Sequence, residues 1–484
     1  MRARLLVASG LATVLATGST ALAAPPWSPP RDISAPVPEV TRTSIGFGAD
    51  GVALVGWTEQ SNLPGRPFRT PEARFTALFP DGHVEDRARL PAGEQAQAQV
   101  FGGNRTVVLR ERRRDPRGAE SRMRMRLDAS FGTTPGPLLA RTRRVAALWS
   151  VPGGGHWPAL AVSRSGEVAV AWVDLDPRVA RDAFFQRHRV RVAISRGGRR
   201  FRRPRTLASF PLPTPPHQSV AAAYGRRGEL LVAYGAGRRV GNDVLPYVAA
   251  RLRPRAGRRF GREERVGPRR EQSDLAAAAA PNGRMAMVWG SQDGGEEAER
   301  PWVVRAAIRA PGRSFGAPAV LDPGETGERV PGRLALAMAR DGSATAVWTN
   351  VRGGVGDLEY PVRAATALPG AGFGPVTTLA ATGRAGSVSA APDSRMLVTW
   401  SNGAFDFVAP SDASPDAFAA LRPAGAPAPG APETISSPER VDLAPVAAFD
   451  PVSGRPTAAW PAGVRTPFLS GYEQLRMQLA TREG

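Results

Sequence analysis

The sequence of 484 residues contains no cysteine and no lysine, and it has only 4 histidines. The absence of cysteine excludes disulfide bonds, thiolate zinc sites and a cysteine nucleophile. The histidines share no spacing typical of metal ligands, and no apolar run is long enough to cross a membrane. We therefore predict no metal site, no Ser-His-Asp triad, no cofactor and no transmembrane anchor, while a structural cation stays open. The histidines are His83, His156, His188 and His217.

The charge is strongly one-sided. The 64 basic residues, all arginine, outnumber the 43 acidic residues and give a formal net charge of +21. One interpretation is a polyanionic partner, because guanidinium groups pair with phosphate and carboxylate. The other is compositional, because the chain is rich in Ala, Gly, Pro and Arg throughout. The sequence leaves both open.

The N-terminus has the three parts of a secretory signal. Arg2 and Arg4 are followed by an apolar stretch from Leu5 to about Leu15 and by the small-x-small site Ala21-Leu22-Ala23. We predict that residues 1–23 are a signal peptide and that the mature protein is secreted. Export argues against a nucleic-acid partner despite the basic charge.

Internal repetition is the main signal of fold. One sequence pattern recurs eight times. It consists of an apolar run, a turn, and a second apolar run that ends six residues after the turn residue. Glycine is the turn residue in seven copies, and the copy that ends at Trp400 has Ser394 instead. The repeats average about 58 residues, a period typical of stacked supersecondary units. The copies end at Trp57, Leu109, Trp172, Tyr234, Trp289, Trp348, Trp400 and Trp460.

A second phrase lies between these copies. It contains a strand of period two, a Gly-x-x-Phe turn and a short strand. Glycine supplies the positive φ that tight hairpins need. The pairs are Gly198 with Phe201, Gly257 with Phe260, Gly312 with Phe315, and Gly370 with Phe373.

Each repeat thus predicts two hairpins, or four antiparallel strands, as in a β-propeller blade. We predict an all-β fold in which residues 24–484 form a single propeller of eight blades, with seven blades as the alternative. The last phrase, Tyr472–Gly484, lacks a fourth strand, and Trp27–Ser34 has the pattern of one. We therefore expect the two termini to complete one blade, and deletion of Trp27–Ser34 to lower the melting temperature sharply.

The Gly-x-x-Phe turns resemble half of an Asp box, Ser-x-Asp-x-Gly-x-x-Trp. The chain resembles secreted bacterial β-propeller repeat proteins and, more distantly, the Asp-box propellers that include sialidases. The resemblance implies a propeller fold and an activity toward glycans. The boxes are degenerate, because the aspartate position is held by Arg196, Arg255, Ala310 and Leu368.

Polar residues follow the repeat aromatics. Hairpin geometry places the loops after these aromatics on one face of the disc, where they could form a polar mouth that binds a carbohydrate, a peptide or a hard cation. Alternatively, Asp and Asn simply suit strand ends and turns. The candidate binding residues are Glu59, Glu111, Asp174, Asp176, Asp243, Asp293, Asn350, Asp357, Asn402 and Asp406.

Two hairpins are dense in arginine. Residues 187–205 and 251–270 each contain nine arginines and fall in consecutive repeats. They are candidates for a basic edge that binds an anionic polymer, or else they are solvated outer strands. The candidate anion-binding residues are Arg199, Arg200, Arg202, Arg203, Arg258 and Arg259.

These features favour an exported, monomeric, non-catalytic binding module. Its ligand would be a carbohydrate, an anionic cell-surface polymer or a protein. A sialidase-like or other glycan-cleaving hydrolase is the alternative, since paired loop carboxylates could act on a glycosidic bond. The sequence assigns no catalytic residue.

Overall fold

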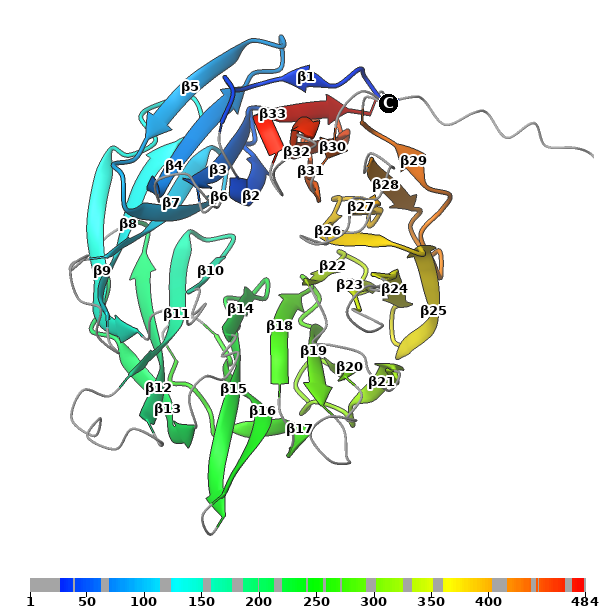
Figure 1. Cartoon of the computed structure of the whole chain (residues 1–484). Coiled ribbons are helices and arrows are strands. Elements are labelled where there is room, and N and C mark those ends of the chain that lie inside the picture. Colours follow the sequence, from blue (N-terminus) through cyan, green and yellow to red (C-terminus); the bar gives the residue numbers. More distant parts are fainter. Residues whose placement is uncertain are drawn as a thin grey trace, which may run out of the picture.

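The computed structural model is an eight-bladed β-propeller (Figure 1). None of the described residues forms a helix that is long and apolar enough to span a bilayer. The predicted signal peptide, residues 1–23, lies outside the described part of the chain. The structure describes residues 27–37, 40–61, 69–113, 123–150, 158–175, 186–198, 200–212, 220–240, 243–255, 258–269, 272–292, 302–324, 333–350, 360–402, 416–436, 441–442, 444–465 and 472–482.

Blades 1 to 4 are four-stranded antiparallel sheets whose strands follow one another from the axis outward. Blade 1 consists of β2 (Val40–Phe47), β3 (Ala53–Ser61), β4 (Arg69–Leu78) and β5 (Val84–Arg89). Blade 2 consists of β6 (Glu94–Phe101), β7 (Arg105–Arg113), β8 (Met123–Thr133) and β9 (Arg141–Ser150). Blade 3 consists of β10 (Ala159–Val162), β11 (Glu167–Leu175), β12 (Gln186–Arg196) and β13 (Arg205–Leu212). Blade 4 consists of β14 (Val220–Tyr224), β15 (Leu230–Val240), β16 (Asp243–Arg253) and β17 (Glu264–Arg269).

Blades 5 to 7 repeat this order, and blade 8 combines both ends of the chain. Blade 5 consists of β18 (Gln272–Ala279), β19 (Met285–Gln292), β20 (Trp302–Arg309) and β21 (Ala319–Asp322). Blade 6 consists of β22 (Leu334–Met338), β23 (Ala344–Thr349), β24 (Val362–Ala367) and β25 (Phe373–Ala380). Blade 7 consists of β26 (Gly383–Ala390), β27 (Met396–Asn402), β28 (Ala417–Arg422) and β29 (Glu433–Thr434). Blade 8 consists of β30 (Val441–Asp442), β31 (Val446–Phe449), β32 (Pro456–Arg465), β33 (Tyr472–Thr481) and β1 (Arg31–Asp32).

The turn between the first and second strands has the same backbone form in every blade. The glycine of this turn has a positive φ in seven blades, for example 85° at Gly166 and 90° at Gly342. In blade 7, Ser394 has a φ of 71° and is the one non-glycine residue with a positive φ in the described part of the chain. The repeat therefore conserves a left-handed position within the molecule, and glycine meets it at the lowest steric cost.

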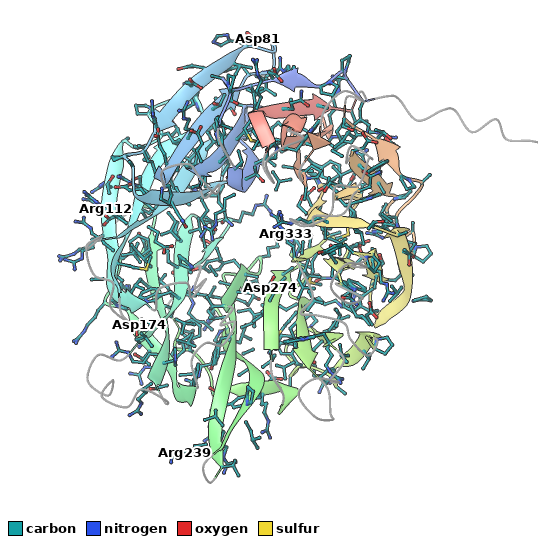
Figure 2. The ribbon with its side chains drawn as sticks, in the orientation of Figure 1. Asp81, Arg112, Asp174, Arg239, Asp274 and Arg333 are labelled. Atoms are coloured by element: carbon teal, nitrogen blue, oxygen red, sulfur yellow. The ribbon has the colours of Figure 1, made fainter. Side chains whose placement is uncertain are left out.

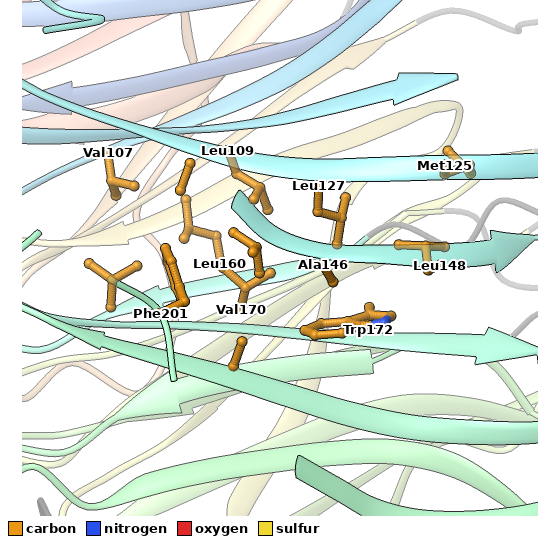
Figure 3. Packing of buried hydrophobic residues seen from close by; sticks show 14 of the residues in the cluster. Val107, Leu109, Met125, Leu127, Ala146, Leu148, Leu160, Val170, Trp172 and Phe201 are labelled. Atoms are coloured by element: carbon orange, nitrogen blue, oxygen red, sulfur yellow. The ribbon is translucent and has the colours of Figure 1, made fainter. Parts of the chain in front are cut away.

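The repeat aromatics pack between neighbouring sheets. All eight terminal positions, from Trp57 to Trp460, are at most 2% exposed, and Leu109 occupies the same layer in blade 2. Figure 3 shows Trp172 of blade 3 beside Leu148 and Ala146 of blade 2. Burial of such side chains contributes about 1.5–3 kcal/mol each, so the inter-blade layers are a principal source of stability.

The N-terminus closes the ring, as predicted. β1 pairs with β33, and Arg31 lies opposite Leu479. Backbone hydrogen bonds extend the pairing, from Ile33 N to Met477 O at 2.7 Å and from Val37 N to Leu475 O at 2.6 Å. The first strands of neighbouring blades contact one another around the whole ring. Closure gives β33 a partner strand, so that the last blade does not end in an unpaired long strand.

The strand directions define two faces. The turns between first and second strands and those between third and fourth strands lie on one face, here called the turn face. The second strands end on the opposite face, just beyond the layer of repeat aromatics. The predicted acidic residues and the predicted arginines therefore belong to different faces of the disc.

Candidate functional site

Three of the predicted binding residues are buried within the protein and form hydrogen bonds or ion pairs with other side chains. Glu59 is buried, accepts a hydrogen bond from Trp57 Nε1 at 3.1 Å and forms an ion pair with Arg74 at 2.8 Å. Asp174, labelled in Figure 2, is buried and pairs with two arginines of β12 in the same blade. Asn350 donates to a carboxylate oxygen of the buried Asp322 at 2.8 Å. Glu59 and Asp174 thus pair within their own blades, and Asn350 contacts the neighbouring blade 5. Ligand binding by these residues stays a prediction.

The remaining predicted residues of that face fall into two groups. Glu111 lies at the end of β7, Asn402 ends β27 and bonds to the backbone of Asp416, and Asp243 begins β16. The others lie outside the described residues: Asp176, Asp293, Asp357 and Asp406.

Three arginines from three different blades meet at the ring axis. Arg42 belongs to β2 of blade 1, Arg333 immediately precedes β22 of blade 6, and Arg384 belongs to β26 of blade 7. Arg333 interacts electrostatically with both other arginines. Figure 2 shows Arg333 and Asp274 on the inner side of the ring. We call Arg42, Arg333 and Arg384 the axial arginine cluster.

Two acids accompany the cluster. Glu111 interacts with Arg42, and Asp274 of β18 interacts with Arg333. Among the described groups that interact with Arg42 or Arg333, three arginines thus meet two carboxylates, an excess of one positive charge within this group.

Burial and mutual repulsion act together on these guanidinium groups. Arg42 and Arg333 are half-buried. Burial and the charge of Arg333 lower the pKa of Arg42 to about 9, although Glu111 opposes the shift. Burial and Arg384 lower the pKa of Arg333 to about 10, against the influence of Asp274. Both groups stay charged at neutral pH, and an additional anion would stabilise the charged forms.

Sequence analysis missed this cluster, although the sequence carries a signal. Arg42, Asp274 and Arg333 each lie fifteen residues before the repeat aromatic of their blade, and Arg384 lies sixteen before. These positions begin the first strand, which lies nearest the axis. The repeat therefore places one residue per blade at the same level of the ring.

The predicted basic residues lie on the turn face. Arg200, Arg202 and Arg203 of blade 3 and Arg258 and Arg259 of blade 4 are all exposed. Arg199 lies outside the described residues. The two groups belong to adjacent blades, as the repeat spacing predicted.

Comparison with known proteins yields fold neighbours. No protein-family model matches the sequence, and no curated protein does. The chain is similar to the β-propeller domain of the Trilobed protease from Pyrococcus furiosus, with 9% identity, 84% of this chain and 97% of that chain covered, and a TM-score of 0.42.

Two carbohydrate-active enzymes are also among the neighbours. The NanB sialidase from Streptococcus pneumoniae has 10% identity, with 95% of this chain and 99% of that chain covered and a TM-score of 0.36. The α-L-arabinanase from Penicillium chrysogenum, complexed with arabinobiose, has 14% identity, with 67% and 92% covered and a TM-score of 0.36. A sialidase is thus among the similar structures, in line with the resemblance stated above, and the similarity concerns the fold.

Proposed function

We propose that the protein is an exported propeller that binds an acidic carbohydrate and holds a carboxylate of this ligand at the axial arginine cluster. The observation that carries the proposal is the meeting of Arg42, Arg333 and Arg384, from three blades, at one level of the ring. Guanidinium groups bind carboxylates through two parallel hydrogen bonds, which gives both charge and shape selectivity.

The electrostatics of the axis support an anionic ligand. Like charges that lie close together in a half-buried region destabilise one another. Glu111 and Asp274 offset only part of this repulsion. A bound carboxylate would bring the cluster close to neutrality and would interact strongly there, because the surrounding protein screens charge less than water does.

The same acids favour binding over cleavage. A glycosidase needs one carboxyl group that retains its proton and a second that is ionised. Glu111 and Asp274 each interact with an arginine of the cluster, and a neighbouring guanidinium favours the ionised carboxylate. The pair therefore suits charge balance better than proton donation.

Titration calorimetry with trigalacturonate tests the proposal. We expect the wild-type protein to bind trigalacturonate and not its methyl ester, which lacks the charge. Arg333→Gln should weaken binding by about tenfold or more, since a charged hydrogen-bonded group contributes about 1.5–3 kcal/mol. The matched control is Arg340→Gln, which removes an exposed arginine from the turn face of the same blade. Equal binding by the Arg333 and Arg340 variants would contradict the proposal.

Cleavage and export have their own measurements. Mass spectrometry of the same mixtures should find intact trigalacturonate. Product formation that is lost in Glu111→Gln or Asp274→Asn would instead favour the hydrolase.

Export is supported by the three-part N-terminal segment, and N-terminal sequencing of protein from the culture medium should find Ala24 first.

A further inference from the structure

The turn face of blade 3 carries a group of exposed arginines. Arg200, Arg202, Arg203 and Arg205 lie in and beside the turn between β12 and β13, and all four are exposed. No ion pair joins them to a carboxylate within the described part of the chain.

Blade 4 carries a second group at the equivalent turn. Arg255, Arg258, Arg259 and Arg262 lie between β16 and β17 and are exposed. We call these eight arginines of blades 3 and 4 the basic turn surface. Its two halves belong to neighbouring sheets, since β13 contacts β15 and β16.

The acids of this region are directed into the ring. Glu167 is 4% exposed and is held by Arg253, Arg196 and Tyr224. Glu263 accepts hydrogen bonds from the hydroxyls of Tyr234 and Tyr247 at 2.8 and 2.9 Å. Glu264 and Glu229 are half-buried and accept hydrogen bonds from the backbone N–H groups of Phe315 and Arg227. No ion pair joins these four carboxylates to the eight arginines in the described part of the chain, so direct pairing does not neutralise the basic turn surface.

The same surface lacks the features that other anionic partners require. Nucleic-acid strands are bound by exposed aromatic rings as well as by charge. Membrane docking needs exposed apolar side chains that enter the interface. Phe201 is buried, Phe260 is half-buried, and none of the strongly exposed large apolar residues of the described chain lies in these turns.

We propose that the basic turn surface docks onto an acidic polysaccharide, whose successive carboxylates pair with the arginines of both blades. The protein itself uses this pairing in the same region, where two nitrogens of Arg253 face the two carboxylate oxygens of Glu167. The inference does not rest on the axial proposal, because the two regions lie on opposite faces.

Retention on immobilised polygalacturonate tests this inference. The test variant replaces Arg202, Arg203, Arg258 and Arg259 with serine. The matched control removes the same number of exposed arginines elsewhere, at Arg112, Arg141, Arg340 and Arg455. We expect the test variant to bind about tenfold more weakly and with a shallower dependence on salt, because fewer counterions are released. The control should lose far less, and the test variant should bind trigalacturonate as the wild type does.

The outcomes separate the alternatives. Equal weakening of the test and control variants would show that net charge alone governs binding and would overturn the inference. Tighter binding to duplex DNA, inorganic polyphosphate or anionic phospholipid vesicles than to polygalacturonate would overturn the choice of partner. Melting curves that match the wild type confirm that a loss of retention is not a loss of fold. Weaker retention of the test variant with unchanged trigalacturonate binding would support this inference even if the axial proposal fails.

Discussion

Blades 3 and 4 and blades 6 and 7 share one strand order and the same turn positions, yet they use arginine in opposite ways. On the turn face of blades 3 and 4 the arginines are exposed. The corresponding turns of blades 6 and 7, residues 368–372 and 423–432, contain no charged residue. A uniform compositional bias would enrich arginine equally in both regions. The difference therefore indicates that the exposed arginines in these turns are a local property of blades 3 and 4.

Two buried arginines, Arg284 of blade 5 and Arg422 of blade 7, hydrogen-bond to the turns of blades 6 and 7. Arg284 donates to Gly342 O and Leu368 O, each at 2.7 Å, and also to Ala371 O. Arg422 is fully buried and donates to Ser343 Oγ at 2.7 Å and Ala426 O at 2.8 Å. At the seam of blades 3 and 4 the buried arginine is instead held by a carboxylate, that of Glu167. Asp341 is half-buried and interacts electrostatically with Arg284 and Arg422. The seams thus differ in whether the buried arginine is hydrogen-bonded to a buried carboxylate or to turn oxygens.

The largest expected effect follows from breaking the charged seam. Glu167→Ala leaves the guanidinium of Arg253 buried without its carboxylate, which typically costs about 3–5 kcal/mol. Chemical denaturation measures the free energy of unfolding. The control is Glu85→Ala, which breaks a partly exposed ion pair with Arg87 and should cost no more than about 1 kcal/mol. Similar losses in both variants would contradict the comparison.

A smaller loss of stability is expected between blades 5 and 6, where Arg284 is hydrogen-bonded to turn carbonyls. Arg284→Met removes charged hydrogen bonds to three turn carbonyls, at a cost of about 1.5–3 kcal/mol. The carbonyls belong to surface turns, where water can replace the lost donor, so the cost should be below that of Glu167→Ala. The same denaturation series decides the order, and a larger loss for Arg284→Met would reverse our interpretation of the two seams.

Acid should weaken the two seams unequally. Burial raises the pKa of Glu167, but hydrogen bonds and charge from Arg253, with bonds from Arg196 and Tyr224, outweigh burial and hold the pKa below its ordinary value of 4.5. The stabilisation is therefore complete above pH 4.5 and is lost as the pH falls through the lowered pKa. The stability difference between the wild type and Glu167→Gln should shrink on acidification, whereas that of Arg284→Met should not.

The smallest effect on stability is expected when arginines are introduced into the blade 6 turn that corresponds to the arginine-rich turn of blade 3. Gly372 and Gly374 hold the positions in blade 6 that correspond to Arg200 and Arg202, and a side chain at Gly372 would meet open space. Gly372→Arg with Gly374→Arg should change the free energy of unfolding by about 0.5 kcal/mol or less. Retention on polygalacturonate should nevertheless increase. Unchanged retention would show that two arginines outside blades 3 and 4 cannot extend the surface.

The fold was predictable because its signals are local. A positive φ at a fixed turn position favours glycine, and Ser394 shows that this backbone conformation persists even where glycine is absent. The buried aromatic six residues later marks the same strand in each blade. The fourth strand of blade 8 was predictable from Trp27–Ser34, because its pattern repeats that of other outer strands.

The candidate sites were less predictable because they depend on which side chains meet once strands and blades are assembled. Glu59 was expected at a solvent-facing mouth. Side chains two residues apart share one side of a strand, so Glu59 points to the buried side as Trp57 does. Its partner Arg74 comes from the next strand, where it lies opposite Trp57. The axial cluster joins residues as far apart as Arg42 and Arg384, and only the closed ring brings them together.

The shared last sheet has a consequence for biogenesis. β1 is the first strand to emerge from a ribosome or an export channel, but its partner β33 is the last. Blades 1 to 7 can each form as synthesis proceeds, whereas the circle stays open until the final strand arrives. A chain arrested just before β33 would contain seven complete blades, an incomplete blade 8 and an unpaired β1. Such an open chain would be a substrate for chaperones and proteases.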